Sequence, residues 1–176
     1  LMGLCAHRTG RRGVTDLNQR VSAQLGTGGA LSPGLPAYPV QPLMVTRNDS
    51  ALGLFNGDIG VVMPDADSPG RLQAVFIDTA GDEHAVSLGR LPEHETAYAM
   101  TVHKAQGSQA RQVVLVLPTQ LSPVLSRELI YTGITRAEQS LEIWAAHEVL
   151  AGAIGRSAQR ATGLADRLQG RSASGP

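Results

Sequence analysis

Cysteine and aromatic residues are scarce in this chain of 176 residues, and neither sign of charge is in excess. Cys5 is the only cysteine, which excludes an internal disulfide and favours a reducing compartment, so we expect a cytoplasmic location. One Trp, three Tyr and two Phe are too few to predict a channel in which bases stack on aromatic rings. Acidic and basic side chains number 15 each, so any surface that attracts a polyanion must be local.

Long apolar runs are also missing. No segment approaches the length of a membrane-spanning helix, so we expect no membrane partner. No basic segment precedes an apolar one at the N-terminus, so we expect no signal peptide. The start at Leu1 instead indicates that the chain begins inside a longer protein.

Two parts that nucleoside-triphosphate hydrolysis requires are absent as well. A phosphate-binding loop has the pattern G-x-x-x-x-G-K-[ST], but Lys104 is the only lysine and no glycine directly precedes it. No apolar strand ends in Asp-Glu, which would hold Mg²⁺. We expect no metal site either, because no metal-ligand spacing occurs among His7, His84, His94 and His147.

The pattern of apolar residues predicts an α/β fold with an inserted small unit. Short apolar runs are typical of buried strands in a parallel sheet, with helical stretches between them, and they occur at residues 1–6, 98–102, 113–117 and 141–144. A further run at 43–46 and the run at 98–102 bracket three short strands with close turns. These three strands, at 59–63, 72–77 and 85–88, predict a small antiparallel barrel.

Helices and boundaries complete this expectation. Leu17, Val21 and Leu25 recur at four-residue spacing after Thr15, a candidate helix cap, and a second helix is expected from Ser126 to Glu138. Residues 26–42 are rich in Gly and Pro and predict a loop, and the tail from Ala145 is expected to be helical. We therefore expect an α/β domain over residues 1–46 and 96–170, a barrel over 47–95, and a disordered tail over 171–176.

The stretch Thr101-Val102-His103-Lys104-Ala105-Gln106-Gly107-Ser108 carries the first candidate site. A buried strand ends there in a polar turn, and open α/β sheets bind ligands at the carboxyl ends of their strands. Thr101 and His103 can donate hydrogen bonds to strand phosphates, and Gly107 allows a phosphate or a neighbouring domain to approach the backbone. An ordinary strand-to-helix turn with solvated His and Lys side chains is the alternative.

Arg136 is the second candidate, at the end of the expected helix from Ser126 to Glu138. An arginine in that position can satisfy the last carbonyl groups of the helix and its negative dipole end. It can also reach a γ-phosphate on a neighbouring domain. The residues of the helix alone favour the first of these two roles.

Five stretches resemble motifs of one protein family. In order, they are Leu4–Arg8, Arg47–Gly60, Arg90–Glu95, Thr101–Ser108 and Tyr131–Ala137. The last two resemble the final motifs of superfamily 1 helicases, and all five, in this order and spacing, resemble the alpha subunit of bacterial exodeoxyribonuclease V, the RecD family. The resemblance covers residues 1 to about 168 and implies a RecA-like second motor domain of a DNA helicase. It also implies a Src-homology-3-like barrel between about Arg47 and Glu95.

The resemblance also implies roles for particular residues. Arg136 would be an arginine finger and Arg8 a second γ-phosphate sensor, both acting on ATP with Mg²⁺ held mostly by a first motor domain that this chain lacks. Gly107 and Gln109 would lie on the nucleotide side, although the family has a glutamate at position 109 and an aromatic residue at position 110, where this chain has Gln109 and Ala110. The residues expected to contact DNA are Thr101, His103, Lys104 and Asn48.

Two functions remain open at this point. The first is the C-terminal part of an ATP-dependent DNA helicase subunit in recombinational double-strand-break repair, with single-stranded DNA and the other exodeoxyribonuclease V subunits as partners. The second is a non-catalytic module in which a helicase remnant supports binding of DNA or protein. No carboxylate cluster resembles a nuclease metal site. The resemblance implies that the nuclease activity of exodeoxyribonuclease V lies on another subunit, so we expect no cleavage by this chain.

Overall fold

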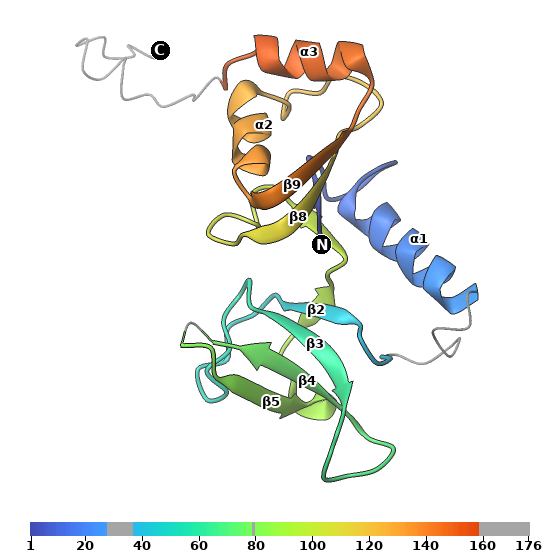
Figure 1. The fold of residues 1–176 in the computed structure, drawn as a ribbon, viewed down its shortest axis with the longest axis vertical. Helices are drawn as coiled ribbons and strands as arrows, with labels where there is room; N and C mark the ends of the chain where they lie inside the picture. The colour runs from blue at the N-terminus through green and yellow to red at the C-terminus, as the bar shows by residue number, and fades with distance from the viewer. Residues whose placement is uncertain (28–36, 79, 159–176) are drawn as a thin grey trace, which may run out of the picture.

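A computed structural model of the protein describes residues 1–27, 37–78 and 80–158. This part of the chain forms two β-sheets, one parallel and one antiparallel. The parallel sheet lies above the antiparallel sheet in Figure 1, and the chain passes from the first to the second and back. No helix in the described part is long and apolar enough to cross a membrane.

The parallel sheet has the strand order β7-β1-β8-β9. Its strands are β1 (Met2–Cys5), β7 (Ala99–Thr101), β8 (Ala110–Val116) and β9 (Ala137–Trp144), and every neighbouring pair is parallel. Cys5 is fully buried, and burial raises the pKa of its thiol to about 12. The thiol is therefore a core group with little nucleophilic character at neutral pH.

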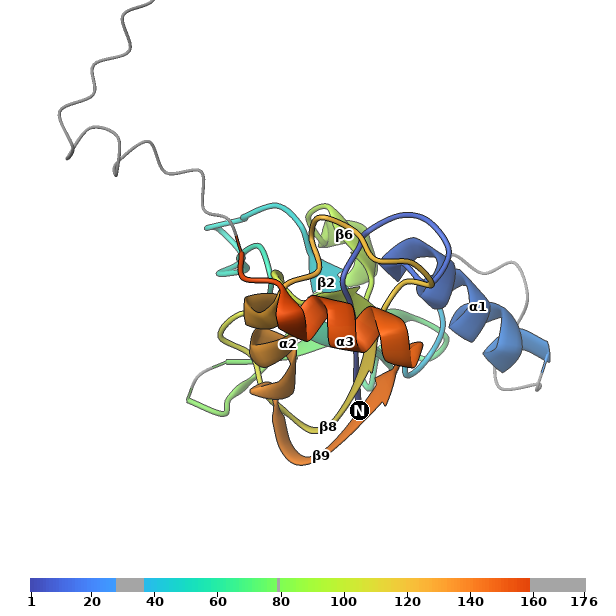
Figure 2. The same ribbon diagram turned by 90° about the horizontal axis from the view of Figure 1, so that it is seen from above.

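Helices lie on both faces of this sheet. Leu4 packs in the same core cluster as residues of α2 (Arg127–Ile134) and α3 (His147–Gly155), whereas Cys5 packs with α1 (Val14–Thr27). Successive residues of a strand point to opposite faces, so α1 covers the face opposite to α2 and α3. Figures 1 and 2 show α2 and α3 side by side, with α1 set apart from them.

The antiparallel sheet has the order β5-β4-β3-β2-β6. Its strands are β2 (Pro42–Val45), β3 (Ile59–Pro64), β4 (Leu72–Ile77), β5 (Glu83–Ser87) and β6 (His94–Thr96), and a short 3₁₀ helix, η1 (Leu88–Arg90), follows β5. A separate core supports it, built from Leu43, Val45, Leu54, Val62, Ala74, Phe76 and Val86. The strands β3, β4 and β5 lie where the short apolar runs and close turns predicted them.

Strand β2 corrects the expected boundary. We expected residues 43–46 to be a strand of the parallel sheet, but β2 pairs with β3 and β6 in the antiparallel sheet. The reason is that Leu43 and Val45 alternate with Met44, so one side of the strand fills the smaller core. The expected barrel is not confirmed, because β5 and β6 are the two edges of this sheet in the described residues.

Three further expectations about elements were wrong. Hydrogen-bonded turns, rather than a helix, connect β7 to β8. Helix α2 ends at Ile134 instead of Glu138, because β9 begins at Ala137 and pairs with β8 from there. Thr15 lies inside α1, where its hydroxyl donates to the carbonyl oxygen of Arg8 at 3.2 Å. Most of the expected 26–42 loop and the expected tail over 171–176 lie outside the described residues.

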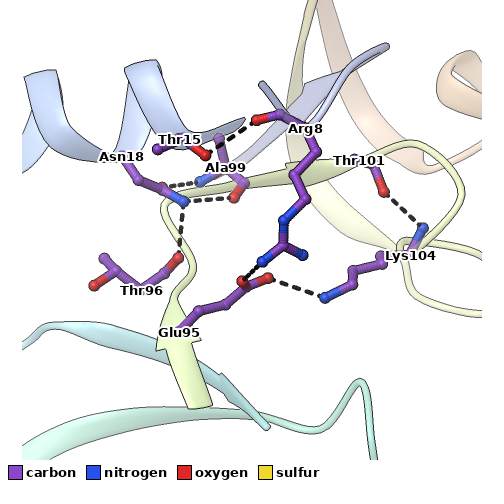
Figure 3. Close-up of polar contacts among 8 residues, drawn as sticks. All are labelled: Arg8, Thr15, Asn18, Glu95, Thr96, Ala99, Thr101 and Lys104. Carbon is purple, nitrogen blue, oxygen red and sulfur yellow. Dashed lines mark hydrogen bonds and ion pairs between the residues drawn. The ribbon is translucent and has the colours of Figure 1, made fainter. Parts of the chain in front are cut away.

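Asn18 joins α1 to both sheets, and the sequence analysis did not single it out. Its side-chain amide donates to the carbonyl oxygens of Thr96 at 2.8 Å and Ala99 at 3.0 Å, and its side-chain oxygen accepts from the backbone nitrogen of Ala99 at 2.8 Å. These bonds lie at the point where the chain leaves β6 and enters β7 (Figure 3). The buried amide therefore fixes where one sheet ends and the other begins.

Candidate functional site

Thr101 is the last residue of β7, and its hydroxyl shapes the turn that follows. The Thr101 Oγ1 atom accepts a hydrogen bond from the backbone nitrogen of Lys104 at 3.2 Å, and the Thr101 carbonyl accepts one from Ala105 at 3.1 Å. A hydroxyl that accepts a bond still has its own proton to donate. The side chain of His103 is exposed on the same turn. Both side chains therefore retain a hydrogen-bond donor that the described contacts do not use.

Gly107 ends this turn, and its backbone explains the residue type. Its φ of 89° is in the left-handed region, where side chains other than glycine are strained. A Cβ atom at this position would meet no atom within 4 Å, so close packing inside the chain is not the reason for glycine. Gln109 follows with an exposed side chain, directly before β8 begins at Ala110.

Arg136 connects the two candidate motifs. Its Nη1 atom donates to the carbonyl oxygen of Ser108 at 3.1 Å, and its Nε and Nη2 atoms donate to the Thr132 carbonyl at 3.2 Å and the Thr135 hydroxyl at 3.1 Å. The carbonyl of Arg136 itself accepts from the nitrogen of Ala110 at 2.9 Å. The guanidinium thus holds the end of α2 against the turn that precedes β8.

This geometry is compatible with both roles that the sequence allowed for Arg136. The bond to the Thr132 carbonyl is the helix-capping contact that an arginine makes near a helix C-terminus. A guanidinium has five N–H donors, and each nitrogen of Arg136 donates one of the three bonds described. The half-buried side chain can therefore keep its position and still donate to a further anion.

Arg8 and Lys104 meet at one carboxylate, that of Glu95. The Nη2 atom of Arg8 lies 2.8 Å from Glu95 Oε2, and the Nζ atom of Lys104 lies 3.0 Å from Glu95 Oε1 (Figure 3). Arg8 follows β1 and Lys104 follows β7, whereas Glu95 lies in β6 of the other sheet. The sequence analysis did not identify Glu95 as a site residue. Its partners lie 87 and 9 residues away, and no local spacing predicts such a contact.

The Glu95 carboxylate faces an open cleft of about 820 Å³ between the two sheets. Residues of both sheets line this cleft, among them Arg8, Thr46, Asn56, His94 and Lys104. The remaining expected DNA contact, Asn48, lies next to it, because its side-chain oxygen accepts from the backbone nitrogen of Asn56 at 2.7 Å. Asn48 is exposed and supports the wall of the cleft.

The expected site residues are therefore anchored at opposite ends of the strands. Thr101 ends β7, and Arg8, His103 and Lys104 follow the carboxyl ends of β1 and β7. Gln109 and Arg136 instead precede the amino ends of β8 and β9. Val116 is level with Cys5 in the sheet, and Ala110 is level with Ala137. At about 3.3 Å per residue, the rise from Ala110 to Val116 is about 20 Å. The structure does not bring Arg8 and Arg136 together.

No group of three or more His, Cys, Asp or Glu side chains that could hold a metal ion occurs in the described ranges.

Tyr98 directly precedes β7, and its phenol donates a hydrogen bond to the Tyr38 hydroxyl at 3.0 Å. The pKa of this phenol is raised because the group is withdrawn from water. It is therefore a neutral structural group and not a candidate acid or base at neutral pH.

Comparison with known proteins identifies the family. Residues 96–143 match the family model described as UvrD-like helicase C-terminal domain. Over 166 residues, or 94% of this chain, the sequence is 43% identical to a Mycobacterium tuberculosis (strain CDC 1551 / Oshkosh) protein named RecBCD enzyme subunit RecD. This chain belongs to the RecD family. It spans only 28% of the length of that RecD relative.

A second RecD-type relative and two solved structures extend the likeness. The ATP-dependent RecD2 DNA helicase of Deinococcus radiodurans is 33% identical over 132 residues, which is 74% of this chain and 18% of that protein. The Pif1 helicase of Candida albicans has a TM-score of 0.59 at 14% identity and covers 98% of this chain and 50% of its own. A Bacteroides Pif1 helicase in complex with ADP-AlF3 and ssDNA has a TM-score of 0.56 at 16% identity, covering 99% of this chain and 46% of its own. These likenesses show that this RecD-family chain has a RecA-like helicase fold.

Proposed function

We propose that this chain is the second motor domain of an ATP-dependent DNA helicase subunit of exodeoxyribonuclease V, which acts in recombinational double-strand-break repair. It would bind single-stranded DNA and work with the other subunits of that complex. ATP with Mg²⁺ would be held mostly by a first motor domain that this chain does not contain. The antiparallel sheet would be the inserted Src-homology-3-like barrel.

The observation that carries this proposal is the bond between Arg136 and the Ser108 carbonyl. It links the segment that precedes β9 to the segment that precedes β8, so Arg136 and Gln109 lie at the same end of the sheet. Arg136 can then act on the γ-phosphate of ATP, and Gln109 can accept a hydrogen bond from the nucleotide sugar through its amide oxygen. Arg8 follows β1 at the opposite end of the sheet and pairs with Glu95, so this geometry gives no support to its expected contact with the same γ-phosphate.

The DNA would lie along the other ends of β1 and β7. Thr101, His103 and Lys104 are there, and the turn of residues 102–107 leads directly from them toward Gln109. A strand that moves past His103 would therefore displace the same segment that meets the nucleotide. This continuity offers a physical route from ATP hydrolysis to movement along DNA.

One observation favours the alternative, a non-catalytic binding module. All three nitrogens of Arg136 donate to oxygens of its own chain, as they would in a residue that only caps a helix. In that case the antiparallel sheet would dock DNA or a protein partner, and the parallel sheet would be its scaffold. His103 separates the two functions better than Thr101, because its side chain is exposed, whereas the Thr101 hydroxyl also holds the turn after β7.

The test is binding of labelled oligothymidine to this chain, followed by fluorescence anisotropy across a series of salt concentrations. We expect measurable binding that weakens as salt rises, because each phosphate contact by a cation releases counterions. Thr101→Val and His103→Ala should each weaken binding by roughly three- to thirtyfold, in line with the loss of one or two hydrogen bonds.

Thr119→Val is a control that removes a hydroxyl from an exposed position outside the candidate site. It should leave the dissociation constant unchanged. If the chain binds oligothymidine and neither Thr101→Val nor His103→Ala weakens binding, the proposed DNA contacts are wrong.

A further inference from the structure

The Glu95 carboxylate pairs with two cationic side chains, those of Arg8 and Lys104. Each of its oxygens contacts a different cation, Arg8 at 2.8 Å and Lys104 at 3.0 Å. Arginine and lysine bind phosphate oxygens with the same charge-assisted hydrogen bonds that they make to carboxylates. Arg8 and Lys104 therefore have the geometry of a small oxyanion site, and the Glu95 carboxylate of the same chain occupies that site.

We propose that Arg8 and Lys104 form a phosphate site and that the Glu95 carboxylate occupies it until a phosphate replaces it. This inference rests on the proposed function, since it names the contact that a phosphate of bound DNA or of a nucleotide would take over. Glu95 would act as an internal competitor for that contact.

Exposure and charge make the exchange feasible. The Arg8 side chain is 61% exposed, and the side chains of Lys104 and Glu95 are 30% and 23% exposed, so solvent and ligand reach the pairs from the cleft. Ion pairs that water reaches are weakened by solvent screening, the Arg8 pair most of all because its guanidinium is the more exposed cation. An incoming phosphate can therefore displace the carboxylate at small cost.

Replacement of the Glu95 carboxylate by a phosphate would also affect how the two sheets are held together, because the cations and the carboxylate belong to different sheets. Arg8 and Lys104 follow strands of the parallel sheet, and Glu95 lies in β6, which pairs with β2 of the antiparallel sheet. Release of Glu95 removes two ion pairs between the sheets and leaves the Asn18 bonds in place. Occupation of the phosphate site would thus loosen the antiparallel sheet without detaching it.

Glu95→Gln tests directly whether the Glu95 carboxylate competes with phosphate, because glutamine keeps the shape of the side chain and removes its charge. We expect this variant to bind labelled oligothymidine about three- to tenfold tighter than the wild-type chain, the gain from losing two weak competing ion pairs. Glu83→Gln is the matched control, because Glu83 is an exposed carboxylate in β5, the far edge strand of the same antiparallel sheet, and does not line the cleft. That control should change affinity by less than about twofold.

A second set of variants identifies the cations. Arg8→Ala and Lys104→Ala should each reduce the slope of log K against log salt by about 0.7, the value for one phosphate contact to a single strand. In the Arg8→Ala, Lys104→Ala double variant the gain from Glu95→Gln should disappear. Thermal unfolding of each variant shows that it is folded before its affinity is compared.

The outcomes separate this inference from the proposed function. The phosphate site is overturned and the DNA function stands if the wild-type chain binds oligothymidine and Glu95→Gln leaves that affinity unchanged. The same conclusion follows if Glu95→Gln still raises the affinity in a chain that lacks the Arg8 and Lys104 side chains. If Glu95→Gln tightens binding of ATP and not of oligothymidine, the site exists and its phosphate belongs to the nucleotide. If no variant binds oligothymidine, inorganic phosphate or ATP, both proposals fail.

Discussion

At the scale of single residues, hydrogen bonds explain most of the candidate site. Thr101 and Arg136 each use part of their bonding capacity to shape the backbone and keep the rest available, the first as a hydroxyl proton and the second as further guanidinium N–H groups. A residue of this kind can serve structure and ligand at once. Its two roles must therefore be separated by experiments that measure stability and activity independently.

Glu128 gives a pH prediction at this scale. Its pKa is lowered to about 2 from an ordinary value of 4.5, mainly by its own backbone N–H and then by the N–H of Ala158, which donates at 2.7 Å. Because the folded pKa is the lower one, ionised Glu128 stabilises the fold above about pH 4.5, and this contribution is lost as the pH falls toward 2. We expect Glu128→Gln to lower the melting temperature at neutral pH and to have no effect near pH 2.

Thermal unfolding followed by circular dichroism, from neutral pH down to about pH 2, measures this difference. The exposed and uncharged Gln139 offers a control, since Gln139→Ala should change the melting temperature by the same small amount at every pH. A wild-type minus Glu128→Gln difference that stays constant across the whole range would show that the carboxylate is not responsible.

The sequence indicated most of the candidate residues but not how they are paired. Thr101, His103 and Lys104 were found because a buried strand ends beside them, and the structure places them as that pattern predicts. Glu95 was missed because its role depends on Arg8, which is brought close only by the assembled sheets. Local spacing carries no signal for a contact of that kind.

At the scale of elements, Asn18 connects α1 to the junction between the sheets. Its replacement by Ala would leave the buried nitrogen and carbonyl of Ala99 and the carbonyl of Thr96 without these partners. Unpaired buried backbone groups are costly, so we expect the free energy of unfolding to fall by about 2 to 4 kcal/mol. Denaturant unfolding measures this change.

Gln19 is the matched control, because it is the next residue of α1 and is exposed. Gln19→Ala should change the free energy of unfolding by less than about 0.5 kcal/mol. Equal effects of the two substitutions would mean that the Asn18 bonds do not hold the junction.

Strands and helices were predicted best where a pattern is local. The strands β3, β4 and β5 are short apolar runs separated by turns, so their positions follow from the sequence. The assignment of β2 to a sheet did not follow, because a strand of four residues fits either sheet until its partners are known. The end of α2 was misplaced for the same reason, since pairing of β9 with β8 ends the helix early.

At the scale of the whole molecule, the proposed function gives this chain only one half of a nucleotide site. We expect residues 1–176 alone to hydrolyse no ATP, because the sequence has no phosphate-binding loop and no Asp-Glu pair at the end of an apolar strand. Steady-state ATPase measurements with and without single-stranded DNA test this expectation. DNA-stimulated turnover by a pure preparation would contradict it.

The central claim is that Arg136 acts on ATP, and the turnover of Arg136→Ala tests it most directly. The substitution belongs in a full-length RecD-type subunit that contains this chain, with single-stranded DNA saturating. Binding of oligothymidine and the melting temperature are measured beside turnover, because Arg136 also holds the end of α2. Arg136→Lys is included because a point charge does not reproduce the planar fork of arginine.

We predict that Arg136→Ala lowers the turnover of ATP by about 10³-fold or more, as loss of an arginine finger does, while DNA affinity stays within about twofold. Arg136→Lys should recover little of this loss. If a folded Arg136→Ala protein keeps more than about a tenth of the wild-type turnover, Arg136 is a helix cap and the account is wrong.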